Sequence, residues 1–410
     1  MDNEQNTAGS GFSLPDLLRK MIEMRGSDLH LTTNNPPRVR VDGHLAPLDG
    51  YRNMTPADTK QLAYSVLTDS QKHRFEENLE LDFSFGLKGL ARFRANIFNQ
   101  KGATGAVFRA IPYEIKQFDE LGLPTIVRDL CKKPRGLILV TGPTGSGKST
   151  TLATMVDKIN TDRSEHIMTI EDPIEFLHQH KNCLVNQREV NADTHSFGAA
   201  LRTALRQDPD VILIGEMRDL ETIEMALRIA ETGHLTLATL HTNSTISTIN
   251  RIIDVFPAGQ QAQIRTQLSL VLEGIMCQAL LPKTSGAGRA MALEIMIPNA
   301  AIRNLIREDK VHQIYSMMQT GQDQFGMQTF NQSLASLYLK KQITLETALA
   351  RSSNSDELRD LIERGAGINS NYMDQSTAFK NKMQGGGTAK PGGPSPYAQG
   401  RSIGSRPPVR

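Results

Sequence analysis

The sequence predicts an α/β protein: a mostly parallel sheet covered by helices on both faces, preceded by a smaller α+β domain and followed by a helical region. After residue 126, helical periodicity alternates with short apolar segments, as in parallel strands buried between helices. Before residue 112, apolar and polar residues alternate one by one, as in strands with one exposed face. A chain of 410 residues is also too long for one ordinary core, which favours two domains.

The first domain is expected over residues 12–112. Ser13-Leu-Pro-Asp16 has the spacing of a helix start, and the apolar residues that follow it form one stripe. A second helix is expected to begin at Thr55-Pro56, and Asp42-Gly43 is typical of a hairpin turn. The expected strands are 28–32, 38–42, 79–85, 93–97 and 105–111.

The rest of the chain divides by composition. Residues 113–125, bounded by prolines, are expected to connect the two domains, and residues 126–368 to form the second domain with its C-terminal helices. Residues 1–11 and the Gly/Pro-rich basic segment 369–410 lack a core-forming pattern and are predicted to be disordered. The strands expected in the second domain are 137–141, 167–170, 211–214 and 235–240.

The segment between the first of these strands and the next helix matches the phosphate-binding pattern G-x-x-x-x-G-K-[ST] completely. Glycines let the backbone N–H groups approach a phosphate, and the helix that follows adds its positive end. Lys148 supplies a charge for the β and γ phosphates, and Ser149 a hydroxyl for Mg²⁺. A chance glycine loop is the alternative, which the strand before it and the helix after it disfavour. The predicted nucleotide-binding residues are Gly142, Pro143, Thr144, Gly145, Ser146, Gly147, Lys148, Ser149 and Thr150.

Acidic residues follow two of the predicted strands, at the sheet edge where such folds bind phosphates. Glu216 follows strand 211–214 and is the candidate ligand of Mg²⁺, directly or through water; the alternative is a solvated strand-end acid. Glu175 and Glu171 follow strand 167–170, and either could orient or deprotonate the attacking water, with Glu175 ranked first. Either could instead be a residue of a turn.

A histidine and several arginines are further candidates for the chemistry. His241 ends strand 235–240, a position suited to sensing the γ-phosphate, although a lone histidine is more often structural. Phosphoryl transfer also gains from an arginine placed at the developing charge. Arg92, Arg94 and Arg109 of the first domain are candidates, and the alternative is that they are simply solvated on an exposed strand face.

Composition and charge argue against several classes of function. No apolar segment approaches the length of a membrane span, and the polar start MDNEQNTAGSG shows no secretory signal. Three cysteines without C-x-x-C spacing argue against a disulfide framework or a zinc site and suit a reducing cytoplasm. The chain carries a formal charge of +2, of which residues 369–410 contribute +5, so the remainder is −3 and gives no support for a nucleic-acid groove.

Five segments together resemble the secretion ATPases, and within that family the retraction ATPases of type IV pili. Four correspond to the family's Walker A, Asp, Walker B and His boxes, and the fifth is typical of retraction ATPases. The resemblance covers residues 12–365. The segments are GPTGSGKST (142–150), IEDPIEF (170–176), RQDPDVILIGEMRD (206–219), TGHLTLATLHTN (232–243) and AIRNLIRE (301–308). The last also has a plainer interpretation, an amphipathic surface helix.

The resemblance implies a RecA-like core, a PAS-like first domain, ATP and Mg²⁺ as cofactors, and a homohexamer. It implies that Arg94 and Arg109 reach the nucleotide of a neighbouring subunit. Turnover would then move one domain against the other and drive an inner-membrane platform protein, so that the pilus depolymerises and the cell twitches. The protein is accordingly expected at the cytoplasmic face of the inner membrane, without a transmembrane segment or nucleic-acid partner.

The resemblance leaves alternatives open. The chain could be an accessory retraction ATPase that works with a paralogue, or a nucleotide-gated adaptor to another pilus motor. Pilus extension and type II secretion relatives are disfavoured, because their four-cysteine metal motif is missing here. A nucleic-acid motor follows from the RecA-like resemblance alone, and the acidic body of the chain disfavours it.

Overall fold

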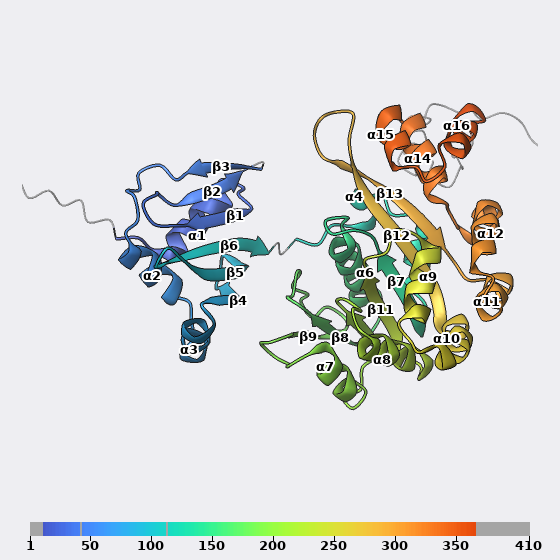
Figure 1. Ribbon diagram of the computed structural model, residues 1–410, viewed down its shortest axis with the longest axis horizontal. Helices are drawn as coiled ribbons and strands as arrows, with labels where there is room; N and C mark the ends of the chain where they lie inside the picture. Colours follow the sequence, from blue (N-terminus) through green and yellow to red (C-terminus); the bar gives the residue numbers. More distant parts are fainter. Residues whose placement is uncertain (1–10, 42, 112–113, 366–410) are drawn as a thin grey trace, which may run out of the picture. The chain divides into compact units, whose positions relative to one another are not determined.

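The computed structural model describes residues 11–41, 43–111 and 114–365 and contains two separate sheets (Figure 1). The predicted disordered segments 1–11 and 369–410 lie outside these ranges except for residue 11, and so does Asp42 of the predicted hairpin turn. Within the described part of the chain, no helix combines the length and the apolar character that a membrane crossing requires.

The first sheet has six strands in the order β3-β2-β1-β6-β5-β4, and all neighbouring strands are antiparallel. The strands are β1 (Asp28–Leu31), β2 (Arg38–Val41), β3 (His44–Pro47), β4 (Glu80–Leu87), β5 (Ala91–Gln100) and β6 (Ala103–Ile111), and the helices are α1 (Leu14–Glu23), α2 (Pro56–Tyr64) and α3 (Asp69–Asn78). All five strands expected here are confirmed. The sequence missed β3, a four-residue edge strand with little burial.

Alternation along β5 separates the two faces of this sheet. Phe93 and Ile97 are fully buried in the core with α1, whereas Arg94, between them, is exposed. The arginines of β5 therefore lie on the face opposite the core, as the alternating sequence predicted. Both strands are longer than predicted, because β5 continues to Gln100 and β6 begins at Ala103, which leaves two residues between them.

The second sheet has seven strands in the order β13-β12-β7-β11-β10-β8-β9, and only the β12–β13 pair is antiparallel. This confirms the mostly parallel sheet. Its strands are β7 (Gly136–Thr141), β8 (His166–Glu171), β9 (Leu184–Glu189), β10 (Val211–Ile214), β11 (Leu235–Leu240), β12 (Leu272–Pro282) and β13 (Arg289–Met296). The sequence prediction missed β9, β12 and β13.

Helices bury both faces of this sheet. Successive residues of β7 point to opposite sides, so that Leu137 and Leu139 join one core cluster while Ile138 and Val140 join the other. The first cluster is covered by α7 (Phe197–Ala204), α8 (Leu220–Glu231), α9 (Thr245–Asp254) and α10 (Ala258–Val271), and the second by α5 (Thr125–Leu130) and α6 (Lys148–Asp162), with α4 (Phe118–Leu121) at its edge. A continuous apolar strand is therefore stable here.

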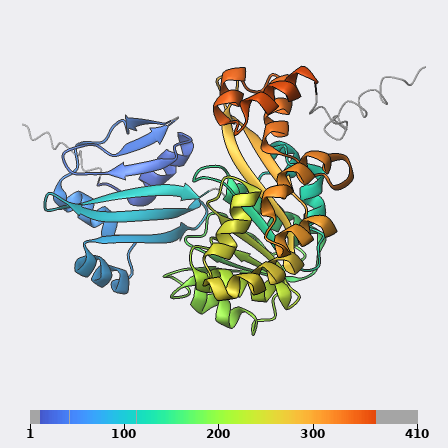
Figure 2. The same ribbon diagram turned by 45° about the vertical axis from the view of Figure 1, so that its right-hand side comes forward.

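The chain after β13 is helical, as predicted, and Figure 2 shows its last helices gathered at the end of the β12–β13 hairpin. The helices are α11 (Ala300–Arg307), the 3₁₀ helix η1 (Val311–Gln313), α12 (Ile314–Thr320), α13 (Gln322–Phe325), α14 (Phe330–Leu339), α15 (Leu345–Arg351) and α16 (Ser355–Glu363). The AIRNLIRE segment forms most of α11. Ile302 and Ile306 are buried, and Arg303 donates to Glu273 Oε1 at 2.9 Å.

The start of α2 offers a test of the local sequence rules. The Thr55 hydroxyl accepts the Asp58 N–H at 3.3 Å, and the Asp58 carboxylate accepts the Thr55 N–H at 2.7 Å. Thr55→Ala is expected to lower the free energy of unfolding by about 1 kcal/mol, because one N–H of the first turn loses its partner. Thr55→Ser keeps the hydroxyl and serves as the control. Urea denaturation monitored by circular dichroism measures the stability of both variants. Equal midpoints for the wild type and Thr55→Ala would contradict the assignment of Thr55 as the cap of α2.

Candidate active site

The glycine-rich segment connects the end of β7 to the start of α6 by a turn that other residues could not make. Gly142 has φ +139°, and a Cβ on it would lie 2.3 Å from the Gln278 carbonyl oxygen. Gly147 caps α6 with φ +89°, in the left-handed region. Gln278 of β12 also holds the loop from behind: its side-chain N–H donates to the Ser146 carbonyl at 2.8 Å, and its oxygen accepts the Thr151 hydroxyl at 3.1 Å.

Two polar groups of this loop fit a phosphate. Lys148 Nζ folds back and donates to the carbonyl oxygens of Gly142 at 2.8 Å and Pro143 at 3.2 Å. The Ser146 hydroxyl is buried and has no hydrogen-bond partner among the residues that the structure describes, and such groups cost free energy unless something binds them. A phosphate would satisfy this hydroxyl and the ammonium together with the first N–H groups of α6. The residues present therefore suit the predicted nucleotide.

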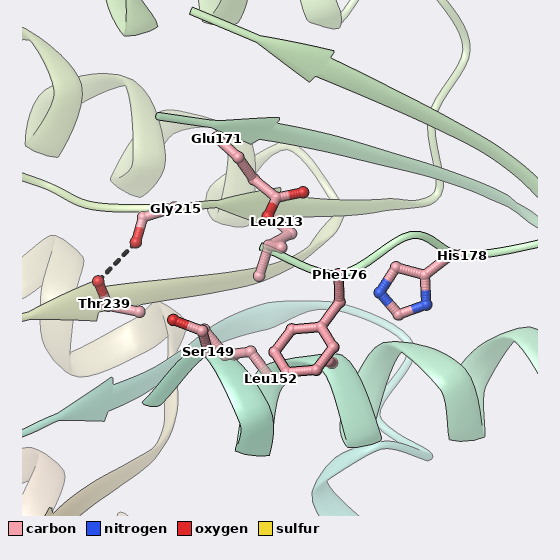
Figure 3. Close-up of a pocket in the computed structure, with 9 residues that line it drawn as sticks. Ser149, Leu152, Glu171, Phe176, His178, Leu213, Gly215 and Thr239 are labelled. Atoms are coloured by element: carbon pink, nitrogen blue, oxygen red, sulfur yellow. Dashed lines mark hydrogen bonds between the residues drawn. The ribbon is translucent and has the colours of Figure 1, made fainter. Parts of the chain in front are cut away.

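The strand order brings the predicted residues to one edge. β7, β11, β10 and β8 are consecutive parallel neighbours, so their carboxyl ends meet. Backbone hydrogen bonds continue past the ends of the strands: the Gly215 N–H donates to the Ile170 carbonyl at 2.8 Å, and the Met217 N–H to the Thr239 carbonyl at 3.0 Å. The Thr239 hydroxyl also donates to the Gly215 carbonyl at 2.6 Å (Figure 3). Glu216, between Gly215 and Met217, is thus held on a fixed backbone.

Glu216 contacts two cationic or potentially cationic side chains. Its Oε2 lies 2.7 Å from Arg218 Nη2, and its Oε1 lies 3.1 Å from His241 Nε2. Partial burial alone would raise the pKa of Glu216, but the hydrogen bond from Arg218 and the charges of His241 and Arg218 outweigh it and hold that pKa below its ordinary value. The structure therefore brings two of the predicted residues, Glu216 and His241, into direct contact.

The carboxylates of Glu216 and Glu175 also affect the pKa of Lys148. Burial lowers the pKa of Lys148, and the negative charges of Glu216 and Glu175 oppose that shift without reversing it. Both acids are therefore close enough to the loop to influence its charge.

The two acids that follow β8 are in different environments. Glu175 is exposed, whereas Glu171 is buried and accepts three hydrogen bonds: from the Thr169 hydroxyl at 2.6 Å, Gln187 Nε2 at 3.2 Å and the Glu175 N–H at 3.4 Å. Burial raises the pKa of Glu171 to about 7 despite these donors. Figure 3 shows Glu171 and Ser149 lining one small cavity from opposite sides, together with Phe176.

The predicted arginines lie on the first sheet, whereas the phosphate loop belongs to the second. Arg94 of β5 and Arg109 of β6 are opposite each other in the antiparallel register. Arg109 Nε donates to Asp28 Oδ1 at 2.7 Å. Their predicted action on a neighbouring subunit is not a property of one chain, and it stays a prediction.

The predicted metal site would draw on few protein ligands. Among the described residues, no group of three or more His, Cys, Asp or Glu side chains could hold a metal ion by itself. Mg²⁺ usually keeps several waters and binds one or two protein oxygens together with substrate phosphates. The Ser149 hydroxyl at the start of α6 and the Glu216 carboxylate are oxygen donors of this kind.

Sequence reasoning missed three groups of residues at this edge. Gln278 and Gln187 belong to β12 and β9, strands that were not predicted, so nothing in the sequence assigned them to the site. Glu189, at the end of β9, accepts the Ile174 N–H at 3.2 Å and fixes the segment that carries Glu175. Arg218 could have been found, because it lies two residues beyond Glu216.

Comparisons with known proteins agree on one family. The model of the Type II/IV secretion system protein family matches residues 12–349. The chain is 53% identical over 340 residues to a Pseudomonas aeruginosa protein named type IV pilus retractation ATPase PilT, covering 82% of this chain and 97% of that protein. It is 42% identical over 361 residues to the type IV pilus ATPase PilU of the same species, covering 88% and 94%. A crystal structure of the pilus retraction motor PilT with bound ADP matches with a TM-score of 0.81 at 53% identity, covering 85% of this chain and 99% of that one.

The raised pKa of Glu171 predicts a pH dependence of stability. The unfolded carboxyl ionises near its ordinary 4.5, whereas the folded one ionises near 7, so the folded chain holds the extra proton between these values. This contribution to stability is complete below about pH 4.5 and is lost as pH rises through 7. The wild-type protein should therefore lose stability relative to Glu171→Gln, which is neutral at every pH, between about pH 5 and 8.

Denaturant midpoints across this pH range measure the difference. Thr169→Val is the matched control, since it removes one hydrogen bond and keeps the carboxyl, and it should show the same trend as the wild type. A constant gap between wild type and Glu171→Gln over the whole range would mean that Glu171 does not titrate there.

Proposed function

This chain belongs to the Type II/IV secretion system protein family, and we propose that it is an ATP-hydrolysing motor that powers the retraction of type IV pili. The observation that carries this proposal is the 53% identity to the retraction ATPase PilT over 97% of that protein's length. The complete phosphate loop and the acids at the same sheet edge supply the chemistry that such a motor needs.

The residues divide the work of hydrolysis as follows. Lys148 neutralises the β and γ phosphates, and the N–H groups and hydroxyls of residues 142–150 cradle them. Ser149 and Glu216 would hold Mg²⁺, Glu216 directly or through water, and the bound ion would neutralise phosphate charge. Glu175 orients or deprotonates the attacking water. His241 contacts Glu216, and in this scheme it responds to the γ-phosphate.

Glu171 takes a supporting role in this scheme. Its carboxyl oxygens already accept the Thr169 hydroxyl, Gln187 and the Glu175 N–H, and it is buried. A base must reach the water that it deprotonates, which the exposed Glu175 can do more readily. We therefore keep Glu175 ahead of Glu171 as the base.

The proposal also covers the homohexamer, the movement of its domains and its partner at the membrane. Arg94 and Arg109 act on the nucleotide of a neighbouring subunit in a homohexamer, which accounts for basic residues on a sheet separate from the phosphate loop. Turnover moves the first domain (residues 12–112) against the second (126–368) about the connection at 113–125. The motor works at the cytoplasmic face of the inner membrane on a platform protein, with or without a paralogous retraction ATPase, and it needs no nucleic acid.

Lys148→Ala tests the motor directly. Loss of the ammonium should reduce ATP hydrolysis to background, because no lysine then neutralises the negative charge of the β and γ phosphates. Cells carrying the variant should assemble pili without retracting them. The control is Lys158→Ala, on the same helix, where Lys158 forms an ion pair with the surface residue Asp162. Hydrolysis would be measured as phosphate release, and retraction as twitching. Full hydrolysis by Lys148→Ala would refute the proposal, and normal retraction without hydrolysis would favour the nucleotide-gated adaptor.

A pair of isosteric variants tests the choice of base. Glu175→Gln should lower kcat by about 10²- to 10⁴-fold while ATP binding persists, because the water loses its proton acceptor. Glu171→Gln should lower it much less, since Glu171 supports the segment from behind. Single-turnover hydrolysis and nucleotide binding would be measured on both proteins. The opposite order of effects would identify Glu171 as the base.

A further inference from the structure

One row of residues on the outer face of the first sheet contains a buried carboxylate and three arginines. The register of the antiparallel strands places Arg94 opposite Arg109, Arg109 opposite Asp28, and Asp28 opposite Arg40. Residues directly opposite each other in neighbouring strands share a face of the sheet. These four residues therefore form one row across β5, β6, β1 and β2, with Asp28 as its only acid.

Asp28 is held firmly at the bottom of this row. Its side chain is 4% exposed, and its Oδ2 accepts the Ser27 hydroxyl at 2.7 Å. Burial would raise the pKa of Asp28, but the hydrogen bonds from Ser27 and Arg109 and the charge of Arg109 hold it below the ordinary value. Asp28 is thus a fixed anion, and the arginine that it binds has a fixed anchor.

Arg109 is anchored at one end of its guanidinium and exposed at the other. Only Nε donates to Asp28, at 2.7 Å, and the side chain is 66% exposed. The two terminal nitrogens of the guanidinium extend beyond Nε and can serve a second anion. Arg94 differs, since among the described residues no hydrogen bond or ion pair holds its guanidinium. The face therefore presents one oriented arginine beside one unrestrained arginine.

We propose that Asp28 is a positioning residue that fixes the direction of Arg109, so that its terminal nitrogens meet the nucleotide of the neighbouring subunit without a further loss of side-chain entropy. This rests on the proposed function, in which Arg109 acts across the subunit boundary. A free arginine side chain loses rotamer entropy when it is ordered, and ordering it before the substrate arrives removes that cost from the reaction. Asp28 itself touches no nucleotide, and it acts only through Arg109.

A double-mutant cycle in the full-length protein tests this role. Arg109→Ala should lower kcat for ATP hydrolysis by about 10³-fold or more. Asp28→Asn keeps the shape of the side chain and removes its charge, and it should lower kcat by on the order of 10- to 100-fold with the KM for ATP nearly unchanged. In the Arg109→Ala background, Asp28→Asn should have no further effect, whereas in the Arg94→Ala background it should lower kcat as it does in the wild type.

Arg40→Ala is the matched control, because Arg40 flanks Asp28 from the other side at 3.9 Å and its removal leaves the bond to Arg109 in place. It should change kcat by less than about twofold, in contrast to Asp28→Asn, since Arg109 stays oriented. Urea midpoints of all variants would show that the sheet remains folded. An Asp28→Ser variant, which removes the charge with a smaller side chain, repeats the cycle if Asp28→Asn is unstable.

The outcomes separate the two proposals. If Arg109→Ala lowers kcat but Asp28→Asn leaves it unchanged or raises it, Arg109 is catalytic and the positioning role is wrong. The same conclusion follows if Asp28→Asn lowers kcat by the same factor in every background, because that result describes a general structural effect. If Arg109→Ala itself has no effect, the action of Arg109 on a neighbouring site is refuted and the positioning role with it.

Discussion

The parallel alignment of four neighbouring strands is the constraint on which the site depends. β7, β11, β10 and β8 all end at the same edge, so residues separated by more than ninety positions in the chain, from Gly142 to His241, are brought together. Hydrogen bonds from Gly215 and Met217 to the adjoining strands extend the alignment beyond the strand ends. Glu216 therefore lies on a backbone that hydrogen bonds hold in place, and not on a flexible surface loop.

At this edge of the sheet, several ionisable side chains have a few specific hydrogen-bond or ion-pair partners. Lys148 is largely buried and donates to two carbonyl oxygens, Glu216 is bound by Arg218 and His241, and the buried Glu171 is surrounded by donors. Leaving the buried charge of Lys148 without a partner would cost several kcal/mol. The buried Ser146 hydroxyl has no hydrogen-bond partner among the described residues, and it lies where the phosphate pattern requires a ligand. The site is thus organised in advance for an anion.

The sequence predicted the parts of this site that depend on local pattern. The phosphate loop follows from its own spacing, and Glu216 and His241 follow from their place after apolar strands. Gln278, Gln187 and Glu189 could not be predicted, because β12 and β9 lack the uninterrupted apolar pattern that marked the inner strands. The pairing of Asp28 with Arg109 spans 81 residues and depends on strand register, which a single sequence does not specify.

The two sheets carry different kinds of candidate residue, and the way in which each residue is held in place explains the difference. The second sheet supplies groups whose positions are fixed by backbone bonds at strand ends, as a site that binds and cleaves a triphosphate needs. The first sheet supplies long cationic side chains from the exposed face of antiparallel strands, where only a side-chain partner can fix their direction. Asp28 is such a partner for Arg109, and no equivalent acid stands opposite Arg94, whose other neighbour in the register is Ser84. An arginine that must meet a separate molecule can thus be oriented in its own domain, independently of the site that it serves.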